Sequence, residues 1–271
     1  MESPNTLSGA AVDALRQPFD GRCWWCGSTD LSAEHKFKRS DLAKLDPKAE
    51  GLYWSDGGPV LQRIRSPKDK RVKFTPNLCK ECNNARSQPS GRAWDQMFDY
   101  IDANWHRGLR RNRSIDLRAA LGDDSAPRKI AEYLVKNMGC TISSSGFSVP
   151  QGLRDFLDGA EAAREIQGAM FRCHECWDDE RADSNTKVGS LIKSQLYAAL
   201  DPETMKPRSF MSEMAVGPIG FIIGWLGAGD APPTFFEVER TTIHDRRSLA
   251  EPQIHACARD RFARIGEVRE S

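Results

Sequence analysis

The sequence predicts an α+β protein in which a short strand–helix unit is followed by a mixed α+β unit. Two CxxC pairs lie in the N-terminal part, Cys23 with Cys26 and Cys79 with Cys82. Apolar residues recur at helical spacing over residues 92–107, and apolar runs with β-branched and aromatic residues follow after residue 210. These patterns indicate both helices and strands in each half of the chain.

The N-terminal unit is expected to start with a cysteine knuckle and a short strand that reaches His35. Residues 66–70 are rich in turn formers and lie between two short strand-like segments, which predicts a β-hairpin. The second CxxC pair leads into a helix start at Asn83, and Pro89 and Gly91 are expected to interrupt that helix. The remaining elements expected in this half are a helical turn over 40–45, strands over 60–65 and 71–74, and a helix over 92–107.

The C-terminal half is expected to begin with a helix over residues 127–138, which has Pro127 in its first turn and Gly139 as its C-cap. Further helices are expected over 153–159 and 161–173, and strands over 211–216, 221–226 and 235–242. We therefore expect a first domain over residues 1–110, a linker over 111–125 and a second α+β domain over 126–271.

Charge is distributed unevenly along the chain, although the net charge is only +1. Residues 1–113 contain 20 Lys and Arg against 14 Asp and Glu, whereas the remainder contains 19 against 24. The basic half is the half with the CxxC pairs, which favours nucleic-acid binding there over ordinary variation in surface charge. The start has no secretory leader pattern and no apolar stretch is long enough to span a bilayer, so we expect a cytoplasmic protein without a membrane partner.

The eight cysteines favour metal ligands and free thiols over disulfides in such a compartment. Four thiolates in two CxxC pairs suit one structural Zn²⁺, because each tight turn presents two sulfurs to the ion. Four buried thiols without a metal are the alternative. A third pair, Cys173 with Cys176, would need His255 and Cys257 to complete a second zinc site, and a helix end with two thiols is the simpler interpretation.

Glu34, His35 and Asn83 have the chemistry of a hydrolytic centre. A neutral imidazole is the usual general base near pH 7. A carboxylate and an amide oxygen are ligands that suit Mg²⁺ or Mn²⁺. If the strand at His35 packs against the helix that starts near Cys82, the three side chains converge.

This arrangement resembles the HNH endonuclease family, whose ββα-metal core has the same order of parts. The resemblance rests on the segments CWWCGSTDLSAEHKFKRS and TPNLCKECNNARS and covers roughly residues 20–110. It implies a zinc-stapled ββα-metal fold and a metal-dependent endonuclease that hydrolyses DNA phosphodiester bonds. The family is frequent in mobile elements, restriction and phage defence.

The resemblance also implies a role for each site residue. His35 would be the general base that activates water, and Glu34 and Asn83 would hold the catalytic Mg²⁺ or Mn²⁺. Asn77 matches the Asn that orients the His. Glu34 departs from the family's usual Asp by one methylene, and Asn84 is a second amide that could replace Asn83 as the ligand.

Five basic residues are candidates for contacts with DNA phosphates: Lys36, Lys38, Arg39, Lys73 and Arg86. Basic residues on an exposed hairpin could equally protect a strand edge from pairing with another chain.

Two other functions stay open. A non-catalytic zinc module would bind nucleic acid or a protein with the same cysteines but without a second metal. A regulatory protein would use its acidic C-terminal half to bind a partner. That half could also form a homodimer. A single catalytic centre would need a dimer or two binding events in order to cut both DNA strands.

Overall fold

The fold is described here from a computed structural model. It describes residues 14–45, 53–54, 62–64, 66, 68–105, 109, 114–160, 165–172, 191–193, 196–201, 204, 206–216, 219–226, 234–245 and 262–265.

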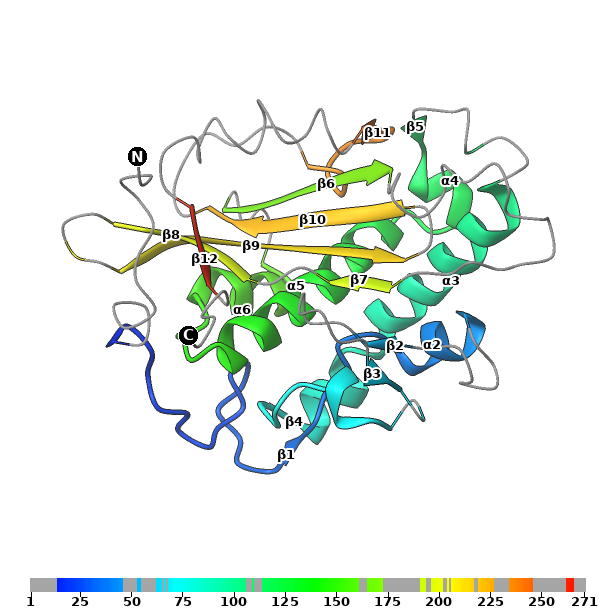
Figure 1. The fold of residues 1–271 in the computed structure, drawn as a ribbon. Helices are drawn as coiled ribbons and strands as arrows, with labels where there is room; N and C mark the ends of the chain where they lie inside the picture. Colours follow the sequence, from blue (N-terminus) through cyan, green and yellow to red (C-terminus); the bar gives the residue numbers. More distant parts are fainter. Residues whose placement is uncertain are drawn as a thin grey trace.

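A large, mostly antiparallel sheet forms one layer of the molecule (Figure 1). The strands follow the order β12-β8-β9-β10-β6-β11-β5, and β7 pairs with β9 beside this path. Within this sheet β11 runs parallel to β6, and the other described pairs are antiparallel. The strands are β5 (Ser114–Ile115), β6 (Ile166–Arg172), β7 (Leu191–Lys193), β8 (Leu196–Leu200), β9 (Pro207–Val216), β10 (Ile219–Trp225), β11 (Thr241–Asp245) and β12 (Phe262–Ile265).

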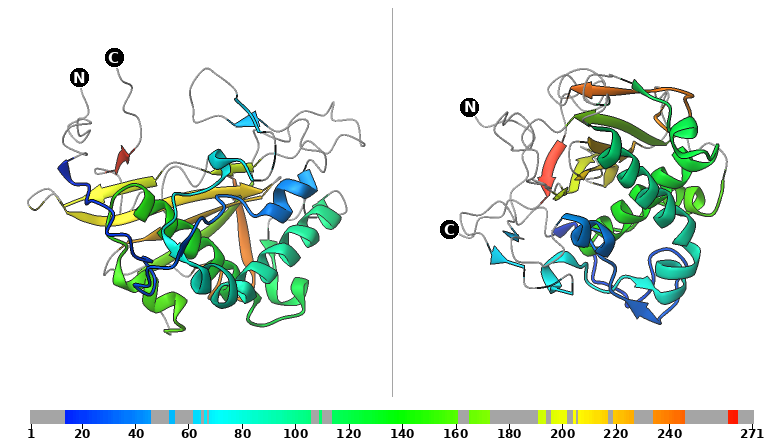
Figure 2. Two further views of the ribbon diagram at one scale, coloured as in Figure 1. Left: turned by 90° about the horizontal axis from the view of Figure 1, so that it is seen from below. Right: turned by 90° about the vertical axis from the view of Figure 1, so that its right-hand side faces the viewer.

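Helices lie along one face of this sheet (Figures 1 and 2). The longest described helix, α5, packs against β8, β9 and β10 of the sheet and against the helices α3 and α6. No helix in the described part of the chain is both long and apolar enough to cross a membrane. The helices are α2 (Arg39–Leu45), α3 (Gln88–Asn104), α4 (Leu117–Leu121), α5 (Ala126–Ser144) and α6 (Gln151–Leu157).

Stacked aromatic rings join the helices to the sheet. Trp94 of α3 stacks on Tyr133 of α5 with 4.5 Å between ring centroids, and it meets Phe221 of β10 at 5.6 Å. Trp94 is fully buried, and removing such a side chain costs about 3–5 kcal/mol. The same hydrophobic cluster contains Cys82 and Phe74 from the N-terminal part. The core is therefore continuous across the domain boundary expected from the sequence.

The N-terminal part lies beside α3 and α5 and is built from very short elements (Figure 1). Strand β1 (Leu31–Ser32) pairs antiparallel with β4 (Leu78–Cys79), and β2 (Tyr53–Trp54) pairs with β3 (Gln62–Arg63). A 3₁₀ turn, η1 (Lys70–Val72), precedes β4. One π-helical turn, η2 (Cys82–Arg86), leads into α3. The chain is thus a mixed α+β protein with a cysteine cluster near its N-terminus.

Two helices are longer than their sequence patterns predict. Helix α3 is not interrupted at Pro89, because proline in the first turn lacks only an N–H that has no partner within the helix. Helix α5 continues through Gly139, which is therefore not a C-cap. The glycine is required there because a Cβ would lie 2.5 Å from the Trp24 ring.

Other expectations from the sequence were wrong in type or in partner. Residues 166–172, expected in a helix, form β6, where Ile166 and Met170 point into the core at strand spacing. Of the segment expected as a strand over 71–74, Arg71 and Val72 lie in η1, because the Asp69 carboxylate accepts hydrogen bonds from the backbone N–H and Nε of Arg71 at 3.0 and 2.8 Å. Lys73 forms only an isolated bridge with His35. Strand β3 pairs with β2 instead.

Residues 114–125, expected in a linker, contribute β5 and α4 to the fold. The Asp116 carboxylate caps α4 by accepting hydrogen bonds from the N–H groups of Arg118 and Ala119, each at 3.0 Å. Strand β5 pairs with β11, so the segment adds to the large sheet. Of the strand expected over 235–242, only its end forms one, since β11 begins at Thr241.

Candidate metal centre and the adjoining polar site

Each CxxC pair sits in a turn fixed by backbone hydrogen bonds. In the first, the Gly27 N–H donates to Cys23 O at 2.8 Å and the Cys23 N–H donates to Ser28 O at 2.7 Å. Gly27 has φ of 81°, a conformation that favours glycine. In the second, the Cys82 N–H points at Cys79 Sγ at 3.3 Å. Pairing of Leu31 with Cys79 in β1 and β4 brings the two turns together.

The four cysteine sulfurs form a compact group suited to one metal ion. All four Sγ atoms lie within 4.8 Å of one another, and Cys26 Sγ is 3.5 Å from Cys79 Sγ. Four Zn–S bonds of about 2.3 Å in a tetrahedron place the sulfurs about 3.8 Å apart. Burial raises the pKa of the Cys82 thiol, so a cation is needed to hold its thiolate. The donor set therefore fits a structural zinc ion.

Two tryptophans inside the first knuckle tie it to the C-terminal half. The Trp24 ring packs on the backbone of α5 at Gly139. Trp25 Nε1 donates to Asp158 Oδ1, after α6, at 2.7 Å. The Arg86 guanidinium lies 4.4 Å from the centre of the Trp25 ring and pairs with the same Asp158 carboxylate. The knuckle is consequently part of the larger core.

The Glu34-His35 dipeptide lies where the β1–β4 pairing continues as a looser ladder. The Phe74 N–H donates to Glu34 O at 2.9 Å, and the Lys36 N–H donates to Val72 O at 2.8 Å. His35 forms an isolated antiparallel bridge with Lys73 between these two bonds. The backbone thus holds Glu34 and His35, which follow β1, against residues 72–74.

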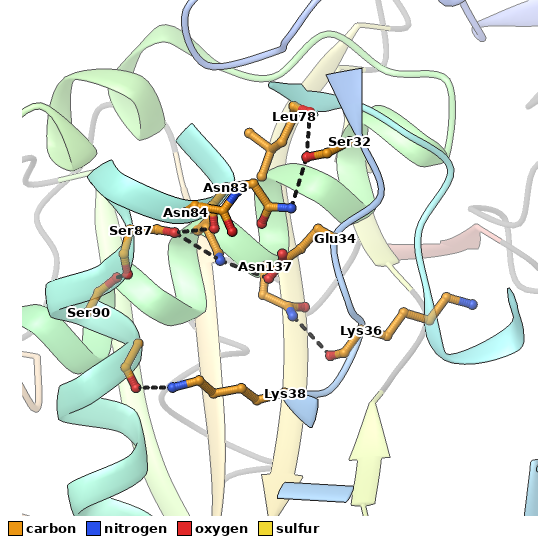
Figure 3. A network of polar contacts seen from close by, with 12 residues as sticks. Ser32, Glu34, Lys36, Lys38, Leu78, Asn83, Asn84, Ser87, Ser90 and Asn137 are labelled. Carbon is orange, nitrogen blue, oxygen red and sulfur yellow. Dashed lines mark hydrogen bonds and ion pairs between the residues drawn. The ribbon is translucent and has the colours of Figure 1, made fainter. Parts of the chain in front are cut away.

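Glu34 forms a buried ion pair with Lys136 of α5. Glu34 Oε1 accepts a hydrogen bond from Lys136 Nζ at 2.8 Å, and the two side chains are only 13% and 6% exposed. The same ammonium group donates to Ser87 Oγ at 3.4 Å. Ser87 Oγ in turn donates to Asn83 O at 2.9 Å. Glu34 and the helix start at Asn83 therefore belong to one polar network (Figure 3).

Asn83 and Asn84 have different surroundings. Asn83 Nδ2 donates to Ser32 Oγ at 3.0 Å, whereas its Oδ1 is buried and accepts no hydrogen bond from the described residues. In Figure 3 the Asn83 amide faces the Glu34 carboxylate across the space between strand and helix. Asn84 is exposed, and its Nδ2 donates to Lys80 O at 2.7 Å. Of the two amides, Asn83 is the one that adjoins Glu34.

The contacts of Asn77 differ from those expected of a residue that orients His35. Its Nδ2 donates to Cys140 O and to Ser144 Oγ of α5 at 2.9 and 3.0 Å. Its Oδ1 is buried and accepts no hydrogen bond within the described part of the chain, and its backbone carbonyl accepts from the Trp24 N–H at 3.1 Å. Asn77 therefore anchors the β4 segment and the first knuckle to α5.

A second buried contact from α5 lies next to the first. Asn137 Nδ2 donates to Lys36 O at 3.0 Å, and Asn137 Oδ1 accepts from Lys193 Nζ of β7. Burial lowers the pKa of Lys193 to about 7. Sequence reasoning missed Lys136, Asn137 and Lys193. The signal available for the first two was a pair of polar residues inside the apolar run from Leu134 to Met138.

The five basic residues expected to contact phosphates divide into two groups. Lys38 Nζ donates to Gly91 O at 2.6 Å and pairs with Asp95, and Arg86 is held by Asp158 and Trp25. Arg39 is exposed, and Lys36 and Lys73 are partly exposed on either side of His35. Burial lowers the pKa of Lys36. The second group is the better placed to meet a ligand near His35.

Among the described residues, the four knuckle cysteines are the group of His, Cys, Asp and Glu side chains arranged to hold a metal ion. Cys173, Cys176, His255 and Cys257, considered for a second zinc site, lie outside the described residues.

Glu34 has a carboxylate, and Asn83 Oδ1 accepts no hydrogen bond from the described residues; both are hard oxygen donors of the kind that Mg²⁺ and Mn²⁺ take. Two such donors would leave most of the coordination sphere of an ion to water, and Lys136 already shares the carboxylate. Comparisons of the chain with protein-family models, with curated proteins and with solved structures found no match.

Proposed function

We propose that the protein is a zinc-stapled, metal-dependent endonuclease of the HNH type that hydrolyses DNA phosphodiester bonds. One observation carries this proposal. In Figure 3 the Glu34 carboxylate faces the amide of Asn83, whose buried Oδ1 accepts no hydrogen bond from the described residues. Glu34 directly precedes His35, on a segment that the pairing of β1 with β4 ties to the cysteine cluster. A buried amide oxygen without a hydrogen bond is costly, and a ligand that it binds would offset that cost.

In the proposed mechanism, the neutral imidazole of His35 removes a proton from the water that attacks the phosphorus. Glu34 and Asn83 would hold a Mg²⁺ or Mn²⁺ ion, which would supply positive charge for the developing phosphorane and the leaving oxygen. Asn77 acts indirectly, because its bonds to α5 fix the strand on which the ladder to His35 is built. The four cysteines hold their zinc as scaffold and do no chemistry.

Support for DNA as the substrate comes from charge. Lys36 directly follows His35, and Lys73 pairs with His35 across the isolated bridge; both lysines are partly exposed. Arg39, four residues after His35, is exposed. Contacts of this kind bind the DNA phosphate backbone whatever its base sequence. We therefore expect the affinity for DNA to fall steeply with salt concentration. One centre cleaves one strand, and double-strand cleavage would require a homodimer or two binding events. Restriction or phage defence would be a suitable setting for such an enzyme.

The proposal is tested by nicking of supercoiled plasmid in Mg²⁺ or Mn²⁺. His35→Ala and Asn83→Ala are expected to reduce the rate by at least about 100-fold, the scale on which a positioned general base contributes. Asn84→Ala is the matched control, since that amide bonds only to the Lys80 carbonyl among the described residues, and it should keep wild-type activity. Full activity of His35→Ala would contradict the proposal.

A non-catalytic zinc module that binds nucleic acid is the second candidate, and the Lys136–Glu34 ion pair favours it. The ammonium group already balances the charge of the carboxylate without a second metal. Glu34→Gln separates the two candidates: DNA binding in a gel-shift assay should survive in both, whereas only an enzyme loses turnover. A wild-type protein that binds DNA but cleaves none with any divalent ion would select the binding module.

A further inference from the structure

The position of Lys136 has a consequence for the metal site. Its ammonium group is 2.8 Å from Glu34 Oε1 and 3.4 Å from Ser87 Oγ, and it lies 5.7 Å from the centre of the Tyr133 ring. Both members of the ion pair are nearly removed from water. A cation is therefore already in place at the carboxylate that the proposed function gives to a divalent ion.

Competition follows from the electrostatics of a buried site. A divalent ion on Glu34 would lie close to the ammonium group, and two like charges repel strongly where little water screens them. Glu34 without any cation would instead be an uncompensated buried charge, which is strongly unfavourable. The carboxylate thus needs one cation and disfavours two.

We propose that Lys136 is a built-in counter-cation of the Glu34–Asn83 site, which a divalent ion has to displace from Glu34. This inference rests on the proposed function in taking Glu34 and Asn83 as the ligands of the ion. It makes metal loading depend on α5, because Lys136 comes from that helix. Before the ion binds, the charge of Glu34 is balanced by Lys136. Asn83 Oδ1, which accepts no hydrogen bond from the described residues, is then left for the ion.

The test compares Mn²⁺ binding by zinc-loaded wild-type protein with Mn²⁺ binding by zinc-loaded Lys136→Met. Binding is measured as the loss of the free Mn²⁺ signal in electron paramagnetic resonance. Mn²⁺ prefers oxygen ligands and so avoids the cysteine cluster. We expect Lys136→Met to bind at least about tenfold more tightly than wild type, and Mn²⁺ to raise its melting temperature more. Lys129→Met is the matched control, since Lys129 lies on the same helix but pairs at the surface with Asp123 at 2.9 Å.

The double variant Glu34→Gln, Lys136→Met has no charged pair and should bind no Mn²⁺ at this site. If Lys136→Met is unfolded on its own, the inference requires that Mn²⁺ restores its folding, because the ion replaces the lost cation. Equal Mn²⁺ affinity in wild type and Lys136→Met overturns the inference, as does a Lys136→Met protein that stays unfolded with Mn²⁺. Binding by Lys136→Met with none by wild type supports this inference while counting against a metal-dependent wild-type enzyme.

Discussion

Substitution of Gly139 by alanine tests whether the cysteine knuckle is built into the core of the protein. The added Cβ would lie 2.5 Å from two atoms of the Trp24 ring, and ordinary contact begins at 3.4 Å. The ring would have to retreat by about 1 Å, which is the difference between these two distances. Trp24 is only 6% exposed, and its backbone N–H is bonded to Asn77 O, so it has little freedom to move.

Two opposing terms set the expected magnitude. Glycine to alanine inside a helix stabilises by about 1 kcal/mol through helix propensity. Overpacking of a tight core costs about 1–3 kcal/mol, and a rigid ring held at its backbone belongs at the upper end of that range. We therefore expect Gly139→Ala to lose about 1–2 kcal/mol, which corresponds to a fall of about 2–4 °C in melting temperature for a protein of this size.

The assay is thermal denaturation of the zinc-loaded protein, with zinc release to a chromogenic chelator measured in parallel. We expect faster release from Gly139→Ala, because Trp24 directly follows the ligand Cys23. Gly91→Ala in α3 is the control, since its Cβ would meet only the end of the Lys38 side chain at 3.3 Å, and it should be neutral or slightly stabilising. A Gly139→Ala protein as stable as Gly91→Ala, with unchanged zinc release, would refute the packing argument.

Two further predictions concern the cysteine cluster and a buried carboxyl group. Cys82→Ser should lower the zinc content, measured by elemental analysis, from about one ion per chain to near zero. It should also destabilise the protein by several kcal/mol, because metal binding contributes to folding. A stable variant that retains its zinc would contradict the assigned ligand set. Burial raises the pKa of Asp41 from 3.8 to about 6, and the nearby Asp95 charge adds to this although a hydrogen bond from Trp94 opposes it. The pKa of Asp41 is higher in the folded state than in the unfolded state, so the stabilisation from protonated Asp41 is present below about pH 4 and is lost as the pH rises through about 6. At about 1.4 kcal/mol per pH unit, the loss in the free energy of unfolding is about 3 kcal/mol. Urea unfolding of Asp41→Asn from pH 4 to 7 should show a correspondingly flatter pH dependence than wild type, and identical curves would contradict the raised pKa of the buried Asp41 carboxyl group.

The parts of the fold that the sequence predicted are those determined by local pattern. The cysteine spacing predicted the four-cysteine cluster. The helical spacing of Trp94, Met97 and Ile101 predicted α3, because such a pattern directly expresses which face of a helix is buried. The strands β9 and β10 were predicted from their apolar runs. In the site, the expected packing of a strand against a helix start predicted that Glu34, His35 and Asn83 converge. Glu34 and Asn83 belong to one polar network through Lys136 and Ser87, and convergence with the His35 side chain stays a prediction.

What the sequence could not predict depends on contacts between distant segments. Gly139 reads as a helix end, and only the approach of Trp24 from more than a hundred positions away explains a glycine inside α5. A lysine such as Lys136 is expected at the surface from the sequence alone, and only its ion pair with Glu34, 102 positions away, accounts for its burial. Residues 114–125 of the expected linker are part of the fold because β5 pairs with β11, far along the chain. Tertiary packing in these cases decided against the local preference.

The central claim is that a divalent ion binds at Glu34 and Asn83 while zinc occupies the four cysteines. Anomalous X-ray diffraction from crystals soaked in Mn²⁺, recorded at the zinc and manganese absorption edges, tests it most directly. We expect a zinc peak among Cys23, Cys26, Cys79 and Cys82. We also expect a manganese peak in contact with the Glu34 carboxylate and Asn83 Oδ1, with Lys136 moved away from Glu34. Zinc at the cysteines with no manganese peak, and an unchanged Lys136–Glu34 ion pair, would contradict it.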